Sequence, residues 1–309
     1  MHKNDDFGKF DFVGKIGIFG GISALLVFLS LAYLMVKGIN YGIDFRGGTE
    51  VQVRFEGAVN IDEIRSNISK LNLGDVGVQG FGEKSEYVIR FQGKDTGSDK
   101  EKNEALNESI TKIKNSLQTS FAEQKPEFLR VDTVGPQVGA ELKRNGFLAV
   151  FYCLLVILVY VALRFDYKYS PGAVICLVHD AIITLAIFGM VGKEVNVPIL
   201  AAIMTLIGYS LNDTIVVFDR IRETEGHYKG KDFSFIINKA INEMLMRTLI
   251  TSGTTFVSAL CLYLFAGGTV SDIAFAIAVG IFFGTYSSVY VAAPSILLME
   301  KLKGKKAYA

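Results

Sequence analysis

Asp213 is a carboxylic acid within a long apolar stretch of this chain, residues 197–218. An aspartate at the centre of a lone membrane helix costs about 2.5–3.5 kcal/mol, and less near the helix end. Asp213 lies about five residues, roughly 8 Å, from the end of its stretch. Burial favours the protonated form of a carboxyl group, whereas a nearby cation favours the ionised form. A group under both influences is suited to taking up and releasing a proton; the alternative is a structural hydrogen bond between helices.

Arg247 is the candidate partner of Asp213, because it opens the next apolar stretch at the corresponding end. If the two stretches are neighbouring helices, the guanidinium group and the carboxylate can meet. The alternative is a topology anchor, in which the stem of Arg247 lies along apolar side chains and its charge reaches the headgroups.

His179 and Asp180 are neighbours in an earlier apolar stretch, residues 171–191, about nine residues from its start. Asp180 is therefore expected to lie deeper than Asp213. A histidine and an aspartate together in a membrane indicate a proton relay. Successive helical residues point about 100° apart, so the two side chains do not both face one cavity squarely. We assign the inward face to Asp180.

A run of small polar residues after Arg247 is the candidate lining of an ion path: Thr251, Ser252, Thr254 and Thr255. Other small residues occur throughout the last three apolar stretches, where they allow helices to approach closely and to hydrogen-bond across. We expect packing to be the role of this second group, which comprises Gly208, Ser210, Gly253, Ser258, Gly280, Gly284, Ser287 and Ser288.

The remaining reactive side chains do not form a catalytic or metal-binding pattern. The three histidines, His2, His179 and His227, are too widely separated in the sequence for a metal site. The three cysteines lie in apolar stretches, which argues against a disulfide framework. The net charge of +1 gives no indication of nucleic-acid binding. We therefore expect no enzymatic activity, no catalytic residues and no bound metal or organic cofactor.

Six apolar stretches must position these residues, in a chain that is 50% hydrophobic with a mean hydropathy of +0.35. A membrane helix needs roughly 20 apolar residues. The first stretch ends in Leu34-Met35-Val36-Lys37 rather than in a small-residue cleavage site, so it is expected to be a retained span and not a signal peptide. The predicted spans are residues 16–36, 146–163, 171–191, 197–218, 248–265 and 271–298.

Basic residues in the short loops predict the orientation of these spans. They gather between spans two and three, between spans four and five, and after span six, whereas the opposite loops carry only Lys193. By the positive-inside rule, residues 1–15 and 299–309 are expected to be cytoplasmic and residues 37–145 to lie outside. The basic loop residues are Arg164, Lys168, Arg220, Arg222, Lys229, Lys231, Lys239, Arg247, Lys301, Lys303, Lys305 and Lys306.

The external segment shows the pattern of an α+β domain. Residues 49–55, 76–81, 86–91 and 128–134 alternate like strands, and residues 59–71 and 102–121 have helical apolar spacing. Asn60 or Asp62 is suited to cap the first helix. This order, β-α-β-β-α-β, predicts a ferredoxin-like domain, a fold that does not by itself specify a function.

A glycine-rich segment, GIDFRGGT at residues 42–49, joins span one to this domain. It does not follow a strand into a helix, so we interpret it as a tight turn, with Asp44 and Arg46 near the headgroups, rather than as a phosphate-binding loop. Residues 92–101 are expected to form a solvated loop.

Four motifs in order resemble the SecD/SecF family of protein-export membrane proteins. They are GIDFRGGT (42–49), VGPQVGAEL (134–142), GYSLNDTIVVFDR (208–220) and RTLITSGTT (247–255). The resemblance implies an accessory role in bacterial Sec protein export at the inner membrane, as one six-helix half related to resistance-nodulation-division transporters. It implies that the aspartate and arginine at positions 213 and 247 belong to an ion-coupling site at the interface of the two halves.

The resemblance also implies partners and a driving force. The expected partners are SecD, the SecYEG translocon, YajC and YidC, with an unfolded preprotein as substrate. The transmembrane gradient of protons or sodium ions would promote translocation and release of the preprotein on the periplasmic side, and a carboxylate suits either ion. One alternative is a half-size exporter of lipids or small molecules with the same ancestry, and another is a structural scaffold. The single small external domain argues against the exporter, and the charges in the membrane argue against the scaffold.

Overall fold

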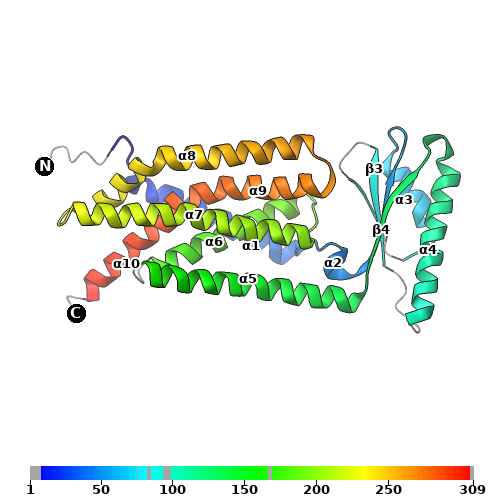
Figure 1. Ribbon diagram of the computed structural model, residues 1–309, viewed down its shortest axis with the longest axis horizontal. Coiled ribbons are helices and arrows are strands. Elements are labelled where there is room, and N and C mark those ends of the chain that lie inside the picture. The colour runs from blue at the N-terminus through cyan, green and yellow to red at the C-terminus, as the bar shows by residue number, and fades with distance from the viewer. Residues whose placement is uncertain (1–7, 75, 82–84, 93–98, 166–168, 307–309) are drawn as a thin grey trace. The chain divides into compact units, whose positions relative to one another are not determined.

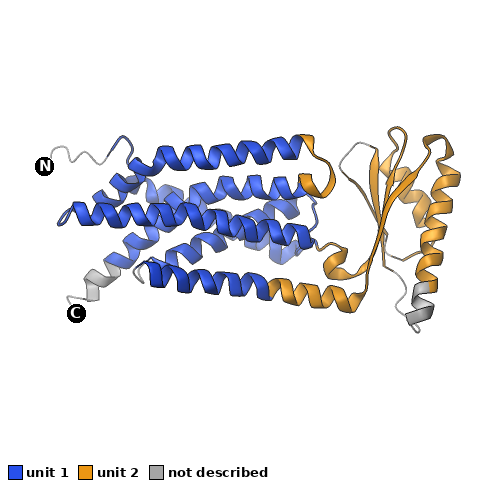
Figure 2. Ribbon diagram, in the orientation of Figure 1, with its two compact units in different colours: residues 1–40, 148–264, 272–309 blue, residues 41–147, 265–271 orange. Residues whose placement is uncertain are grey.

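The computed structural model of the chain describes residues 8–74, 76–81, 85–92, 99–165 and 169–306, without the side chains of residues 99–103 and 301–306. The chain divides into two compact units (Figure 2). One contains Tyr41–Phe147 and Phe265–Ser271, and the other contains Met1–Asn40, Leu148–Leu264 and Asp272–Ala309.

Helices long and apolar enough to cross a membrane occur in six places in the described part of the chain, as the sequence predicted. The first comprises the short turn η1 (Val13–Lys15) and α1 (Ile16–Lys37), and the sixth comprises α9 (Gly268–Ser287), the π-helical turn η3 (Ser288–Ala292) and α10 (Ala293–Lys306). The other four are α5 (Pro136–Arg164), α6 (Ser170–Met190), α7 (Val197–His227) and α8 (Phe233–Phe265).

Several of these helices extend well beyond the apolar stretches. Arg247, which opens the apolar stretch, lies within its helix and not at its start, because α8 begins at Phe233. Helix α7 likewise continues past residue 218 to His227. Ion pairs of Arg220 with Glu223 and Glu243 stabilise the polar ends of α7 and α8. Apolarity marks what lies in the bilayer, whereas the end of a helix depends on capping and on packing of its polar turns.

Helix α6 lies at the centre of the membrane unit. It packs against α1, α7, η3 and α10. Its fully buried side chains include Cys176, Leu177 and Ile183. Gly172 allows a close approach to Ser295, because a Cβ at position 172 would lie 1.9 Å from that hydroxyl oxygen. Figure 1 shows the beginning of α1 and the end of α10 at the same end of this unit, which agrees with an even number of spans.

Two asparagines of α8 bind the backbone that leads into the first span. The side-chain oxygen of Asn238 accepts hydrogen bonds from the amides of Phe12 (2.8 Å) and Val13 (2.9 Å). The amide group of Asn242 donates to the Phe10 carbonyl (2.7 Å) and accepts from the Phe10 amide (2.9 Å). Asparagines therefore tie the start of α1 to the polar extension of α8.

Asn238→Ala is expected to free this segment. It removes the side-chain oxygen that accepts from the Phe12 and Val13 amides. It also removes the bond from the Asn238 amide to Asp11 Oδ1 (2.9 Å). At about 0.5–1.5 kcal/mol per hydrogen bond, local opening becomes easier by roughly 2–3 kcal/mol. Hydrogen exchange at the Phe12 and Val13 amides should accelerate at least about tenfold. Ser258→Ala, which removes a hydroxyl bound only to the carbonyl of Thr254, is the matched control on α8.

The same substitution should change the titration of Asp11. The Gly14 amide, followed by the Asn238 side chain, holds the pKa of the Asp11 carboxyl below its usual 3.8. The stabilisation from the ionised group is present above 3.8 and is lost as the pH falls through the lower folded-state pKa. Asn238→Ala should move this pKa toward 3.8 in a carboxyl NMR titration. An unchanged pKa together with unchanged exchange would contradict the assigned contacts.

The second unit contains a four-stranded antiparallel sheet in the order β2-β3-β1-β4. The strands are β1 (Gly48–Arg54), β2 (Val76–Gly80), β3 (Glu86–Phe91) and β4 (Glu127–Val134), and the helices between them are α3 (Ile61–Ser69) and α4 (Asp99–Ser120). All six elements agree with those predicted. Asn60 caps α3 by accepting the Asp62 amide at 2.9 Å.

Alternation along the strands builds a core on one face of this sheet. Val51, Val53 and Ile89 are fully buried there against Ile64 of α3 and Leu117 of α4. Figure 1 shows both helices covering that face. The opposite face carries the ion pairs of Arg54 with Glu86 and of Arg90 with Glu50. The sheet therefore has one apolar and one polar face, as expected for a half-covered antiparallel sheet.

The glycine-rich segment forms a helical turn and not the simple tight turn that we predicted. Residues Ile43–Arg46 form the short helix α2, and Gly47 and Gly48 follow with φ of 75° and 125°, which favour glycine. Helical hydrogen bonds close this turn, from the Arg46 amide to the Gly42 carbonyl (3.1 Å) and from the Gly47 amide to the Ile43 carbonyl (2.8 Å). The turn lies close to the start of α5, because a Cβ on Gly139 would be 2.9 Å from the Gly47 nitrogen. Of the predicted solvated loop, residues 93–98 lie outside the described residues and α4 begins at Asp99.

Candidate functional site

Asp213 is buried between three helical segments of the membrane unit, with 8% of its surface exposed. Its Oδ2 accepts a hydrogen bond of 2.6 Å from the Ser288 hydroxyl, which belongs to the π-helical turn η3. Thr248 of α8 is a second hydrogen-bonding neighbour of this carboxylate. A π-helical turn within an α-helix is frequently found at a functional site. Asp213 is therefore held where spans four, five and six meet.

Arg247 lies within electrostatic range of Asp213, but no ion pair joins them. Arg247 is exposed on the surface of α8, and the described residues offer it no hydrogen-bond acceptor. An arginine on an apolar helix needs an acceptor, water or another chain. The predicted direct contact is thus absent within this chain, although the two residues are close enough to influence each other.

Asp180 is the centre of a denser polar cluster and is 1% exposed. Its Oδ1 accepts a hydrogen bond of 2.8 Å from Nδ1 of His179. Its Oδ2 accepts hydrogen bonds from Ser210 of α7 at 2.6 Å and from Ser287 of α9 at 2.9 Å. The carboxylate thus joins spans three, four and six. Both His179 and Asp180 are buried, so the prediction of one inward-facing residue was too restrictive.

Three serines that we assigned to packing hold the two carboxylates. Ser210 and Ser287 bind Asp180, and Ser288 binds Asp213. The spacing of Ser210 and Asp213, three residues apart, does place them on one face of a helix. Nothing in the sequence indicates that the adjacent serines of span six reach different carboxylates, because that depends on the π-helical turn and on the positions of α6 and α7.

The predicted lining residues lie on α8 with different exposures. Ser252 is buried, Thr255 is partly buried, and Thr251 and Thr254 are exposed. The hydroxyls of Thr254 and Thr255 both donate to the Thr251 carbonyl at 3.0 Å, which is a common arrangement in membrane helices. Tyr209 of α7 also donates to this carbonyl at 3.0 Å. On α8, the hydroxyl that bonds to Asp213 is that of Thr248, one helical turn before Ser252.

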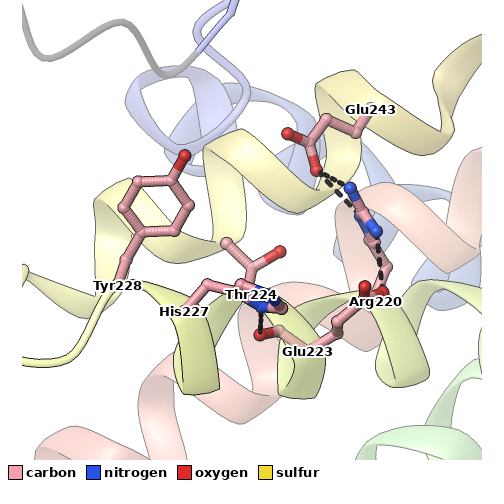
Figure 3. A pocket seen from close by; sticks show the side chains of 6 residues that line it. All are labelled: Arg220, Glu223, Thr224, His227, Tyr228 and Glu243. Carbon is pink, nitrogen blue, oxygen red and sulfur yellow. Dashed lines mark hydrogen bonds and ion pairs between the residues drawn. The ribbon is translucent and has the colours of Figure 1, made fainter.

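A polar pocket of about 410 Å³ lies between the extended ends of α7 and α8 (Figure 3). Arg220 contacts both acidic residues of this pocket, at 2.7 Å from Glu223 and 2.5 Å from Glu243. Lys239 also lies 3.6 Å from Glu243, so two cations pair with these two acids and the pocket lacks the unpaired charge of an ion site. It is lined by Arg220, Glu223, Thr224, His227, Tyr228 and Glu243, none of which belongs to the predicted site. Elsewhere too, the residues with described placement include no group of three acidic, cysteine or histidine side chains suited to a metal ion.

Comparison with known proteins identifies the family. The model for the protein-export membrane protein SecD/SecF, C-terminal, matches residues 112–302, and the SecD/SecF GG motif matches residues 32–59. The chain belongs to the SecD/SecF family. The GG motif contains Gly47 and Gly48, and the larger match contains Asp180, Asp213 and Arg247.

Relatives in the SecD/SecF family cover nearly the whole chain. Protein translocase subunit SecF of Calditerrivibrio nitroreducens is 41% identical, over 97% of both chains. That of Desulfurispirillum indicum is 45% identical, over 90% of this chain and 87% of the relative. The crystal structure of SecDF, a translocon-associated membrane protein from Thermus thermophilus, is 33% identical with a TM-score of 0.84; it matches 97% of this chain, which spans 40% of the SecDF chain.

The family establishes the general function. The chain is an accessory subunit of Sec protein export, which makes it a membrane transport component. The alternative of a half-size exporter of lipids or small molecules is not favoured, because these SecD/SecF relatives are named as translocase subunits. With its six apolar helices, the chain is a multi-pass membrane protein.

Proposed function

We propose that this subunit uses a transmembrane ion gradient to promote preprotein translocation, and that Asp213 binds the coupling ion. The observation that carries the proposal is the buried carboxylate of Asp213, which a hydroxyl of a π-helical turn contacts at 2.6 Å. Loading and unloading of a proton or sodium ion changes its charge, and hence its bond with Ser288. That change is transmitted to span six, because Ser288 is part of its backbone turn.

Arg247 is the proposed cationic partner of Asp213, and Asp180 is a second member of the relay. Arg247 is close enough to act on Asp213 electrostatically, and Asp180 also lies within this range. The proposed lining of the ion path on α8 comprises Thr251, Ser252, Thr254 and Thr255. This assignment is supported by the burial of Ser252, one helical turn after Thr248. The proposal involves no resident metal ion or organic cofactor, since the proton or sodium ion is the transported coupling ion.

SecD is the proposed partner that completes the site. The exposed position of Arg247 supports this assignment, since another chain can provide its acceptor. The name of the similar structure, SecDF, also supports SecD as the partner, and its chain is longer than this one. We further propose that the complex works with the SecYEG translocon on an unfolded preprotein, together with YajC and YidC.

The proposed topology places residues 37–145 in the periplasm as a ferredoxin-like domain. Its sheet order and its element order support this fold. Residues 1–15 and 299–309 are proposed to be cytoplasmic in the bacterial inner membrane, with residues 16–36 as the first span and 146–298 holding the other five. The two ends of the membrane unit lie on one side, and the basic residues in the loops on that side support its assignment as cytoplasmic.

Secretion with imposed gradients tests the proposed function. Inverted membrane vesicles that contain the complex are given a proton gradient or a sodium gradient separately, while ATP is constant. Preprotein export should accelerate with one gradient and not with the other, and the response should require this subunit. An equal rate with either gradient and with none would show that ion coupling is wrong for this chain.

A further inference from the structure

His179 has one ring nitrogen, Nε2, to which the proposed coupling site assigns no role. The residue is 4% exposed, and its Nδ1 is 2.8 Å from Asp180 Oδ1. Its Nε2 is buried and has no hydrogen-bond partner among the described residues. A buried polar atom without a partner is uncommon, and each one calls for an explanation such as water, an ion or a catalytic role. The open nitrogen therefore marks a position that a small ligand can occupy.

The chemistry of the pair identifies this ligand. Asp180 already accepts hydrogen bonds from His179, Ser210 and Ser287. With Nδ1 donating to the carboxylate, the neutral imidazole has its lone pair at Nε2. A proton added there forms imidazolium beside aspartate, which is an overall neutral pair. The Nε2 lone pair forms one N–H bond with a proton from a hydronium ion, whose O–H bond breaks and leaves water. The hydrogen bond between Nδ1 and Asp180 remains.

We propose that His179 and Asp180 form a second proton-binding site, which takes up its proton at Nε2 of His179. The proposal rests on the proposed ion-coupling function and adds a site to it. The proton is shared by the pair in the sense that the imidazole which accepts it is hydrogen-bonded to the carboxylate at 2.8 Å. Asp180 orients the imidazole ring, and Ser210 and Ser287 fix Asp180, so the site is built from spans three, four and six.

The side chains in contact with His179 are mainly neutral, and acidic residues occur on two of the helices packed against α6. Its ring stacks on Tyr286 of α9, with centroids 6.4 Å apart, and Tyr286 in turn contacts Tyr290 of η3. Cys176 lies on the same helix and bonds to Ser287 at 3.0 Å. Helix α1 contributes the Ser23 hydroxyl, which donates to the Tyr286 oxygen at 3.0 Å, and residues 16–32 contain no ionisable side chain. Of the other packed helices, α7 contributes Asp213 and α10 contributes Glu300.

This arrangement couples the two proton sites. Asp180 lies within electrostatic range of Asp213. Two carboxylates in one buried region disfavour each other's charge, and a proton on His179 compensates the charge of Asp180. Occupation of the His179 site therefore makes it easier for Asp213 to release its own proton. Reciprocally, protonation of Asp213 removes a negative charge that favours a proton on His179.

Substitution of His179 separates a structural role from a proton-binding role. In His179→Asn, an amide replaces Nδ1 and can still donate to Asp180, but the variant has no group to protonate at the Nε2 position. We expect normal assembly with SecD and a loss of gradient-driven proton flux of roughly tenfold or more. Wild-type flux with an unchanged pH profile would reduce His179 to a structural donor and overturn the inference.

A spectroscopic measurement tests the same proposal without substitution of His179, and can be used if that variant does not fold. The other two histidines, His2 and His227, can be replaced by glutamine, so that His179 is the only histidine of this chain. With ¹⁵N-histidine in this subunit and unlabelled SecD, solid-state NMR reports protonation of Nδ1 and Nε2 separately. The Nε2 signal should change from that of an unprotonated to that of a protonated ring nitrogen when a proton gradient is imposed, while Nδ1 stays protonated. An Nε2 that is protonated or unprotonated throughout would contradict the proposal.

The outcome at Asp213 distinguishes the two levels of the hypothesis. If Asp213→Asn keeps full gradient dependence, the proposed ion-coupling function itself is wrong. If Asp213→Asn loses it while His179→Asn has wild-type flux and pH profile, only the second proton site is wrong. Loss in both variants, with protonation of Nε2 in the labelled complex, supports both.

Discussion

Replacement of Asp213 by asparagine should abolish the gradient-dependent part of preprotein export. Asparagine has nearly the same shape and can still accept the hydrogen bond from Ser288, so the packing of spans four and six should persist. It cannot change charge, and the coupling ion has no carboxylate to bind. We expect export under an imposed gradient to fall at least about tenfold, to the rate with ATP alone. A tenfold change corresponds to about 1.4 kcal/mol, less than the cost of burying the charge.

Asp219→Asn is the matched control for this experiment. Asp219 lies on the same helix but is exposed, 3.9 Å from Arg164. Its removal changes the charge of the chain by the same amount without affecting the buried cluster. Export and its gradient response should remain within experimental error of wild type. Equal losses in the two variants would indicate a general effect of charge and not ion binding at Asp213.

Replacement of Asp180 by alanine should produce the largest loss of stability. The change leaves the donors of His179, Ser210 and Ser287 without their common acceptor in a region away from water. Removal of one member of a buried polar pair typically costs about 3–5 kcal/mol. We expect the variant to unfold at a markedly lower denaturant concentration in detergent, and to assemble poorly with its partner.

The stability lost in Asp180→Ala can be compared with that of two further variants. Asp180→Asn keeps the shape and one acceptor oxygen, so it should lose less stability than the alanine variant. Thr205→Ala removes an exposed hydroxyl that bonds only to the Ala201 carbonyl at 2.9 Å, and should change stability by less than about 0.5 kcal/mol. If Asp180→Ala is as stable as Thr205→Ala, the cluster does not hold the three spans together.

The fold was largely predictable because its signals are local. Membrane helices are indicated by long apolar stretches, and the strands of the small domain by alternation such as that of Val51 and Val53. The errors occurred where distant residues decide the local structure. Helix α8 begins fifteen residues before the predicted start at Thr248, because its polar turns pair with α7 and bind the segment before α1. The turn at Ile43–Arg46 also lies close to a distant segment, the start of α5.

The candidate site was predictable only in part. The energetic cost of a carboxylate in an apolar helix is enough to single out Asp213 and Asp180. Their partners were not predictable, because Ser210, Ser287 and Ser288 resemble many other small residues that serve packing. Which hydroxyl bonds to which carboxylate depends on how the helices are rotated, and a rotation of one residue changes the direction by about 100°.

The sequence alone determined that Asp213 is an expensive group inside a membrane span, since that follows from residue type and apolar context. It also determined the number of spans and the family motifs around them. Only the tertiary structure decided that Asp180 is bound by donors from three spans, that Arg247 has no acceptor in the described chain, and that Nε2 of His179 is open. The physical reason is that location in the membrane follows from the apolar composition of a stretch of sequence. Hydrogen bonding between side chains depends on residues that come together from different helices.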